Sequence, residues 1–186
     1  MAATIEGFVI VSADGMLADA DGVMPDALKF PGDLAFFSGA LDTMDLIVHG
    51  RKSFEDQPNS PQRRRLIVTH GVAALAPDPD NPNAALWNPA GARFDEACRY
   101  AGVTNGRAAV IGGPDVFALF FDRYDTFWLS QAPGVRLPGG MGCFPGVPAR
   151  SPQAILAAHG LVADERRMLD ATHDVGVTPW RRQTSV

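Results

Sequence analysis

Short runs of apolar and β-branched residues alternate along this chain with helical patterns, and this alternation limits the fold more than any other feature. The runs span residues 4–11, 46–48, 66–68, 84–87, 108–111 and 126–129. Helical patterns occur at residues 34–41, 93–101 and 114–120, where apolar side chains recur at helical spacing or a proline stands first. We therefore predict an α/β fold: a single domain over residues 1–186, with a mostly parallel central sheet flanked by helices.

Two parts of the chain fall outside this alternation. Residues 12–31 hold glycines, aspartates and two prolines, and they predict a long loop, which in a compact domain is usually functional. Residues 161–169 and 175–181 predict a polar, half-exposed antiparallel pair at a sheet edge. An exposed edge strand would allow dimerisation, so the sequence is compatible with a monomer or a homodimer.

Charge and composition exclude several classes of protein. The 186 residues include 16 Lys and Arg against 21 Asp and Glu, a net charge of -5 without a basic face, so we expect no nucleic-acid partner. No stretch approaches the roughly 18 apolar residues of a membrane helix. The N-terminal residues lack the positive flank of a signal peptide. We expect a soluble cytoplasmic protein with no membrane contact.

Cysteine and histidine spacing gives no sign of a metal site. Cys98 and Cys143 stand apart without a CxxC motif, and the four histidines show no HxxxH spacing. Two such thiols are more often reduced core residues, with a disulfide as the open alternative. We expect no metal.

A glycine pair follows the run at 108–111. Gly112 and Gly113 remove side chains from the turn before Pro114, so that a phosphate could approach backbone N–H groups at a helix start. A tight turn also uses glycines for steric reasons alone, and both interpretations stay open. The turn lacks the GxGxxG pattern, which argues against a standard Rossmann domain.

A basic turn follows the run at 46–48 in the same way, where we predict the start of a second helix. Its residues are Gly50, Arg51, Lys52 and Ser53. Two cations and a hydroxyl suit the binding of a phosphate. The basic turn and the glycine turn at residues 112–113 together suit the two ends of a dinucleotide. Ordinary surface charge explains the same residues. Thr69 and His70 either complete an anion pocket or form a plain polar strand exit.

Asp33 is the most informative acid. It stands at the N-terminal end of the first predicted helix and shares a face with Phe37, so that its carboxylate can face an apolar cleft. Burial there would raise its pKa and suit a proton relay or an anchor for the amidine-like edge of a heterocycle. Helix capping explains the same position. Ser130, at the end of a late strand, either reaches this cleft or is a strand-end hydroxyl.

Taken in order, the motifs are more specific than any one alone. They are MP at 24–25, FPGDLAFF at 30–37, GRKSFE at 50–55, IGG at 111–113 with VF at 116–117, and GCFP at 142–145. In this order and spacing the chain resembles the dihydrofolate reductase superfamily, which includes the reductase domain of riboflavin biosynthesis. The resemblance runs from residue 5 to about residue 145.

The resemblance implies a dihydrofolate reductase-like fold and an NADPH-dependent oxidoreductase that acts on a pterin C=N bond. Asp33 matches the family's acid, which holds the pterin ring through N3 and the 2-amino group and supports protonation at N5, and Ser130 matches the hydroxyl behind it. The substrate-binding residues that it implies are Val9, Met24, Asp33, Phe37, Arg63 and Ile111, with Met24 on a mobile loop and Arg63 facing a folate-tail carboxylate. The residues implied to bind NADPH, in preference to NADH, are Val11, Ala18, Gly50, Arg51, Lys52, Ser53, Thr69, His70, Ile111, Gly112, Gly113, Asp115, Val116 and Phe117.

The departures from the family pattern concern the substrate. Asp26 stands where dihydrofolate reductases usually have tryptophan, and Gln57 lies near a usually apolar position of the folate-tail pocket. Residues 12–15 and Asp45 are similar to a less specialised branch of the superfamily. The expected substrate is therefore a dihydropterin, of the dihydrofolate or dihydromethanopterin type. The alternatives are a ribosylamino-pyrimidinone phosphate of riboflavin biosynthesis, or a catalytically silent NADPH-binding module.

Overall fold

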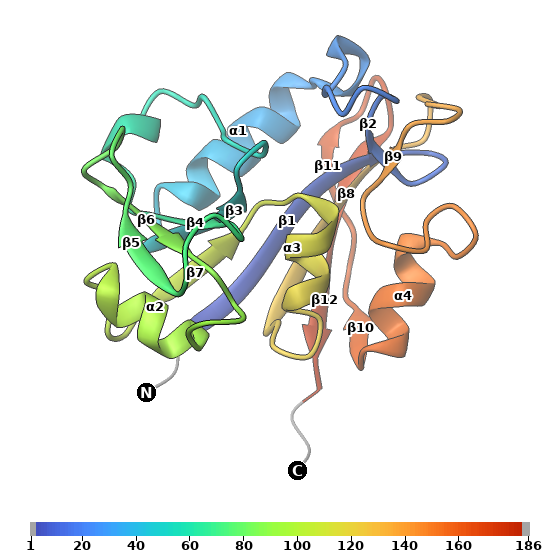
Figure 1. The fold of residues 1–186 in the computed structure, drawn as a ribbon. Coiled ribbons are helices and arrows are strands. Elements are labelled where there is room, and N and C mark those ends of the chain that lie inside the picture. The colour runs from blue at the N-terminus through green and yellow to red at the C-terminus, as the bar shows by residue number, and fades with distance from the viewer. Residues whose placement is uncertain (1–2, 184–186) are drawn as a thin grey trace.

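The computed structural model describes residues 3–183 (Figure 1). Its strands are β1 (Thr4–Ser12), β2 (Met16–Ala18), β3 (Leu46–Gly50), β4 (Arg65–Val68), β5 (Leu75–Pro77), β6 (Ala84–Trp87), β7 (Arg107–Val110), β8 (Thr126–Ala132), β9 (Met141–Gly142), β10 (Leu161–Ala163), β11 (Arg167–Asp170) and β12 (Val175–Arg182). Its α-helices are α1 (Pro31–Leu41), α2 (Phe94–Tyr100), α3 (Pro114–Leu119) and α4 (Pro152–Ala158). Two 3₁₀ turns span Asp26–Leu28 and Ser60–Gln62. Each of the six apolar runs in the sequence contains a strand.

One sheet of ten strands organises the molecule, in the order β10-β12-β8-β1-β7-β3-β4-β6-β5 with β11 also beside β12. The strands from β8 to β6 run parallel, and β5, β10, β11 and β12 pair antiparallel at the two ends. The predicted α/β fold with a mostly parallel central sheet is confirmed.

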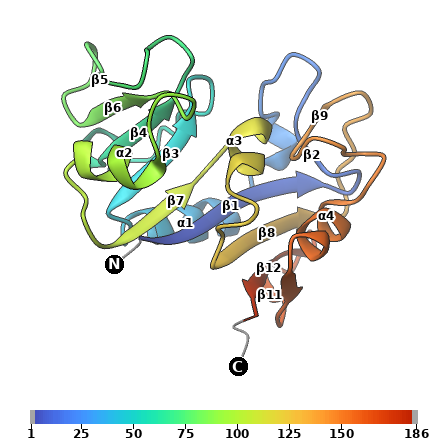
Figure 2. The same cartoon turned by 60° about the horizontal axis from the view of Figure 1, so that its bottom comes forward.

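Helices cover both faces of this sheet. Because alternate side chains of a strand point to opposite faces, Ile5 and Val11 of β1 join the core under α2, α3 and α4, whereas Phe8 packs with Phe36 and Phe37 of α1. Figures 1 and 2 show α1 behind the sheet and the other three helices in front of it. This double cover explains why the central strands are apolar almost throughout.

The segment after β3 does not form the second helix that the sequence predicts. Residues 51–59 are irregular and lead into the 3₁₀ turn at Ser60–Gln62. Pro58 and Pro61 stand within this segment, and a proline inside a helix costs about 3 kcal/mol. The prediction was therefore wrong, because helical propensity was inferred from the basic turn without the prolines that follow it.

The C-terminal part differs from its prediction in two respects. The antiparallel pairing is present, but β12 lies inside the sheet, between β8 on one side and β10 and β11 on the other, and most of its residues are buried. The prediction of a half-exposed edge pair was thus wrong for β12. Helix α4 was not predicted, although Ser151 caps it by accepting a hydrogen bond from the Ala154 N–H (3.1 Å) and Pro152 begins it.

The long loop at residues 12–31 is partly ordered by β2, which pairs with β9. Cys98 and Cys143 are buried free thiols, as the sequence favours. Within residues 3–183, no helix is long and apolar enough to cross a membrane, and no group of three or more His, Cys, Asp or Glu could hold a metal ion.

Candidate active site

Three turns meet at one edge of the sheet because β7, β3 and β4 are neighbouring parallel strands. The turns at Gly112, Gly50 and Thr69 each follow the carboxyl end of one of these strands, where α/β proteins place their ligands. The Gly50 N–H donates to the Gly112 carbonyl at 2.8 Å, which ties the basic turn to the glycine pair. The structure thus brings together the phosphate-binding residues that the sequence predicts.

The glycine pair leaves room that any side chain would fill. Gly112 has a φ of 118°, which L-residues rarely adopt, and the peptide bond to Gly113 is cis. A Cβ on Gly113 would lie 3.3 Å from the Ser53 hydroxyl oxygen. Pro114 then begins α3, with Asp115 in its first turn. The backbone of Gly113, which is half-buried, therefore lies beside the Ser53 hydroxyl, whereas Gly112 is buried.

The basic turn presents its cations to solvent. Arg51 and Lys52 are exposed, and neither has a carboxylate partner at ion-pair distance among the residues that the structure describes. Arg51 Nη1 lies 3.8 Å from the position of a Cβ on Gly71, so the guanidinium stands beside the turn that contains Thr69 and His70. These groups can take up an anion without giving up a protein partner.

Asp33 is withdrawn from solvent in the first turn of α1. Only 6% of its surface is exposed, and Ser130 of β8, itself 2% exposed, hydrogen-bonds to its carboxyl group. Burial raises the pKa of Asp33, and the hydrogen bond from Ser130 opposes that rise in part. Asp33 and Ser130, which are far apart in the sequence, form the pair that the family resemblance implies.

The structure divides the other apolar residues expected to bind substrate among three different clusters. Phe37 and Ile111 are half-buried and pack with the Phe8 cluster under α1. Val9 is half-buried on the opposite face of β1, and Met24 packs at the edge of a separate cluster around Leu28. Among the expected cofactor residues, Val11, Ala18, Val116 and Phe117 are buried, so they can shape a site more readily than contact a ligand widely.

Arg63 has a different environment from the one that the resemblance implies. Its Nη2 lies 2.7 Å from Asp42 Oδ1 and its Nη1 lies 2.8 Å from Glu55 Oε2, and 6% of its side chain is exposed. Glu55 also pairs with the fully buried Arg65. Arg63 is thus tied to two carboxylates of its own chain, because the irregular segment after β3 folds Glu55 inward.

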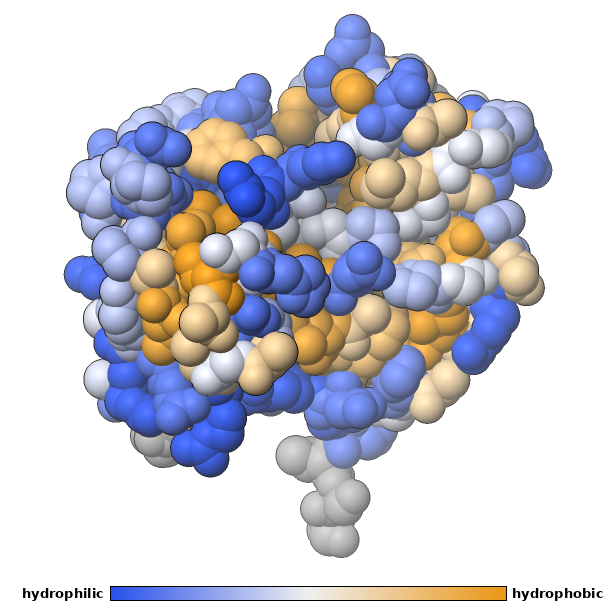
Figure 3. Space-filling view, in the orientation of Figure 1, coloured by the Kyte–Doolittle hydropathy of each residue, from blue (hydrophilic) through white to orange (hydrophobic). Residues whose placement is uncertain are grey.

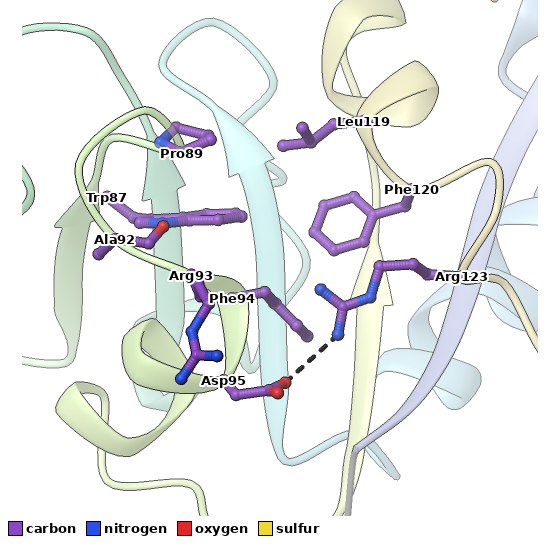
Figure 4. Close-up of a pocket in the computed structure, with 9 residues that line it drawn as sticks. All are labelled: Trp87, Pro89, Ala92, Arg93, Phe94, Asp95, Leu119, Phe120 and Arg123. Carbon is purple, nitrogen blue, oxygen red and sulfur yellow. Dashed lines mark hydrogen bonds and ion pairs between the residues drawn. The ribbon is translucent and has the colours of Figure 1, made fainter.

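A pocket of about 360 Å³, which was not predicted from the sequence, lies between the start of α2 and the end of α3 (Figure 4). Trp87 and Phe94 form one wall and Leu119 and Phe120 the other, while Arg123 and Asp95 form an ion pair of 3.3 Å at one end. The Thr69 N–H donates to the Trp87 carbonyl at 2.9 Å, so the Trp87 wall of this pocket adjoins the turn that contains Thr69. Figure 3 shows apolar side chains on the face that carries α2 and α3. The only sequence signal was a set of aromatic residues, which are typical of any core.

Comparisons with known proteins were made for sequence and for structure. No protein-family model and no curated protein sequence matches the chain. Among solved structures, it is similar to a protein ascribed to riboflavin biosynthesis from Shewanella sp. PV-4, with 18% identity, a TM-score of 0.68 and coverage of 97% of this chain and 99% of the other. It is also similar to dihydrofolate reductase from Enterococcus faecalis in complex with NADP(H) and RAB-propyl, with 16% identity, a TM-score of 0.66 and 97% coverage of both chains. The chain therefore has the fold of the dihydrofolate reductase superfamily, as its sequence motifs predict.

Proposed function

We propose that this protein is an NADPH-dependent reductase that transfers hydride to the C=N bond of a dihydropterin, of the dihydrofolate or dihydromethanopterin type, and gives the tetrahydropterin. The observation that carries this proposal is the Asp33 carboxyl group, buried at the start of α1 and hydrogen-bonded to Ser130. A buried acid with a raised pKa beside a strand-end site is a candidate functional group. Its two oxygens suit the paired N–H donors of an amidine-like ring edge.

The turns at the sheet edge fit NADPH. The bare backbone at Gly112 and Gly113 suits close approach of a pyrophosphate, and the exposed Arg51 and Lys52 beside Thr69 suit an adenosine 2'-phosphate. When bound, NADPH supplies the hydride. The similar reductase from Enterococcus faecalis was solved with NADP(H), which supports the same choice of cofactor here.

The protein's own groups orient the ring, hold a proton and exclude water. Asp33 would fix the ring and, because burial raises its pKa, take up a proton more readily than an exposed aspartate and support protonation at N5. Phe37 and Ile111 would pack on the ring. The loop at residues 12–31 would shield the reacting atoms, with its base held by the pairing of β2 with β9.

Two other functions stay as alternatives. Reduction of a ribosylamino-pyrimidinone phosphate is favoured by the similarity to the protein ascribed to riboflavin biosynthesis. A catalytically silent NADPH-binding module is favoured by Asp26, which is exposed and pairs with Lys29 at 2.8 Å. For either function the protein would act as a monomer or as a homodimer.

Steady-state NADPH oxidation distinguishes these functions. We expect turnover with dihydrofolate or another dihydropterin and little with the pyrimidinone phosphate. Turnover with the pyrimidinone phosphate alone would favour the second function. Tight NADPH binding without turnover of any of these substrates would favour the silent module and contradict the proposal.

The Asp33→Asn variant tests the residue that carries the proposal. The amide keeps the shape but cannot carry the proton, so turnover of a dihydropterin is expected to fall about 100-fold, the lower range of general acid–base contributions. NADPH binding, measured by fluorescence titration, is expected to change little because Asp33 belongs to α1 and not to the turns at Gly50, Thr69 and Gly112. Unchanged turnover would assign Asp33 a helix-capping role.

A further inference from the structure

The segment at residues 51–63, between β3 and β4, wraps around one buried arginine. Arg65, the first residue of β4, has no exposed surface, and its Nη2 donates to the Glu55 carboxylate. The same nitrogen donates to the Ser60 hydroxyl at 2.6 Å and to the Ser60 carbonyl at 3.1 Å. The guanidinium carbon of Arg65 lies 4.4 Å from the centre of the Phe54 ring. Arg65 thus holds the residues that come directly after the basic turn.

Arg65 also reaches the start of the basic turn, through His49. Its Nη1 lies 3.4 Å from His49 Nε2, and because a guanidinium can only donate, this nitrogen of His49 is the acceptor. Burial lowers the pKa of His49 and favours its neutral ring, whose proton is then on Nδ1 and is donated to the Gly50 carbonyl at 2.8 Å. The Ser53 N–H donates to the same carbonyl at 3.0 Å. One residue therefore holds both ends of the turn at residues 50–53.

This turn has a fixed place beside the glycine pair. The Gly50 N–H donates to the Gly112 carbonyl at 2.8 Å, and the Ser53 hydroxyl lies close to the position of a Cβ on the next glycine. Arg51 and Lys52 stand between these fixed points and are exposed. The path of the backbone therefore decides where the two cations stand relative to the glycine pair.

Packing alone does not explain an arginine at this position. A buried ion pair contributes little net stability, because an apolar side chain of similar volume often stabilises a core as much or more. Arg65 Nε is also buried without a hydrogen-bond partner among the residues that the structure describes, which adds to the cost. Because Arg65 is fully buried, it does not reach a bound ligand itself. What its guanidinium provides, and an apolar side chain would not, is a set of directed hydrogen bonds to both flanks of the basic turn.

We propose that Arg65 is a positioning residue for the cofactor: it holds residues 50–53 in the geometry in which Arg51 and Lys52 meet the adenosine 2'-phosphate of NADPH. This inference rests on the proposed function, because the turn must bind that phosphate. Without Arg65 the turn keeps its charges but loses its fixed path, so that binding of the phosphate must also order the turn. NADH, which lacks this phosphate, loses little.

The Arg65→Met variant tests this role by equilibrium binding of NADPH and of NADH, measured by fluorescence titration. Methionine fills a similar volume, and Glu55 keeps Arg63 as its partner at 2.8 Å, so Glu55 does not become an unpaired charge. The Kd for NADPH is expected to rise about fivefold, a part of what one charged contact is worth, and the Kd for NADH to change less than about twofold.

A second variant, His49→Leu, removes the link from Arg65 to the Gly50 carbonyl and adds no charge to the core. The ratio of the two Kd values is expected to shift in the same direction, because one end of the turn is then released. This variant decides the question by itself where Arg65→Met does not fold.

A matched control is Arg182→Met. The guanidinium of Arg182 also holds connecting segments, and none of its partners belongs to the turns at the sheet edge. It donates at 2.7, 2.9 and 3.0 Å to the carbonyls of Phe121, Tyr124 and His159. The ratio of the two Kd values for this variant is expected to equal that of the wild type.

The outcomes separate this inference from the proposed function. A wild-type preference for NADPH that Arg65→Met and His49→Leu both retain in full would overturn the inference alone. Equal shifts of the ratio in Arg182→Met and Arg65→Met would also overturn it, because the effect would then follow from a general loss of stability. A wild-type protein that binds neither nucleotide, or binds both equally, would overturn the proposed 2'-phosphate site and the inference with it.

Discussion

Ionisation of the buried Asp33 carboxyl group destabilises the fold that holds it. Burial raises its pKa in the folded state, while Ser130 lowers it in part. The unfolded chain therefore ionises first as the pH rises, and the contribution of Asp33 to stability is present below the ordinary pKa of aspartate. That contribution is lost as the pH rises through the raised folded value.

The Asp33→Asn variant is accordingly expected to unfold at an equal or higher temperature than the wild type at pH 7, with the difference disappearing near pH 3. Thermal unfolding monitored by circular dichroism across this range measures it. A lower midpoint for the variant at pH 7 would mean that the ionised carboxylate is stabilised by groups other than Ser130. Ionisation of Asp33 is also expected to lower the turnover of a dihydropterin as the pH rises, and the variant is expected to lack this fall.

At the level of single residues, the sequence named Asp33 but left two interpretations open, a buried acid and a helix-capping acid. The structure shows Asp33 buried, which favours the first of these. The pairing of Arg63 with Asp42 and Glu55 was out of reach, because these partners come from a helix end and an irregular segment. No period or motif relates such residues, and their contact depends on the path of the 51–63 segment.

At the level of elements, the turn after β3 shows which part of a pattern is predictive. A strand followed by a basic turn predicts an anion site at the carboxyl edge of a parallel sheet, and the observed strand order places that turn beside Gly112. The helix expected next is absent because of Pro58 and Pro61. The Ser151 and Pro152 signal for α4 was in the sequence, but α4 lies outside the part covered by the family resemblance.

The basic turn gives a prediction for cofactor choice. Arg51→Ala removes a charged contact to the 2'-phosphate, which is worth about 1.5–3 kcal/mol, so the Kd for NADPH is expected to rise about tenfold or more. The Kd for NADH, which lacks this phosphate, is expected to change little. The control Arg64→Ala removes a cation whose Nη1 donates to the Ala101 carbonyl at 3.0 Å and leaves both constants unchanged. Equal losses for the two nucleotides with Arg51→Ala would contradict a 2'-phosphate site.

At the level of the whole molecule, the C-terminal strands support the helix that carries Asp33. Gly32, the residue before Asp33 in α1, packs on the backbone of Leu169 in β11. A Cβ at Gly32 would clash with the Leu169 carbonyl oxygen. β12 pairs with β8 so that Val177 lies opposite Ser130. β11 thus positions the helix that carries Asp33, and β12 positions the strand that carries Ser130.

Two alanine substitutions in α1 test this support. Gly32→Ala is expected to destabilise the protein by about 1–3 kcal/mol and to lower turnover, because α1 must move away from β11. Gly39→Ala, in the same helix with open space around its Cβ position, is expected to stabilise the protein by about 0.5–1 kcal/mol. Denaturant unfolding and NADPH oxidation measure both variants. Similar stability changes of one sign would show that β11 does not constrain α1.

The position of β12 inside the sheet also orders events during synthesis on the ribosome. β1, α1 and β8 leave the exit tunnel well before residue 175, and until then the outer edge of β8 has no neighbour. A nascent chain halted before that point therefore exposes an apolar strand edge to chaperones and has Ser130 without the strand that fixes it. Ligand capture by stalled chains is expected to begin abruptly, once β12 has emerged, rather than to grow with chain length.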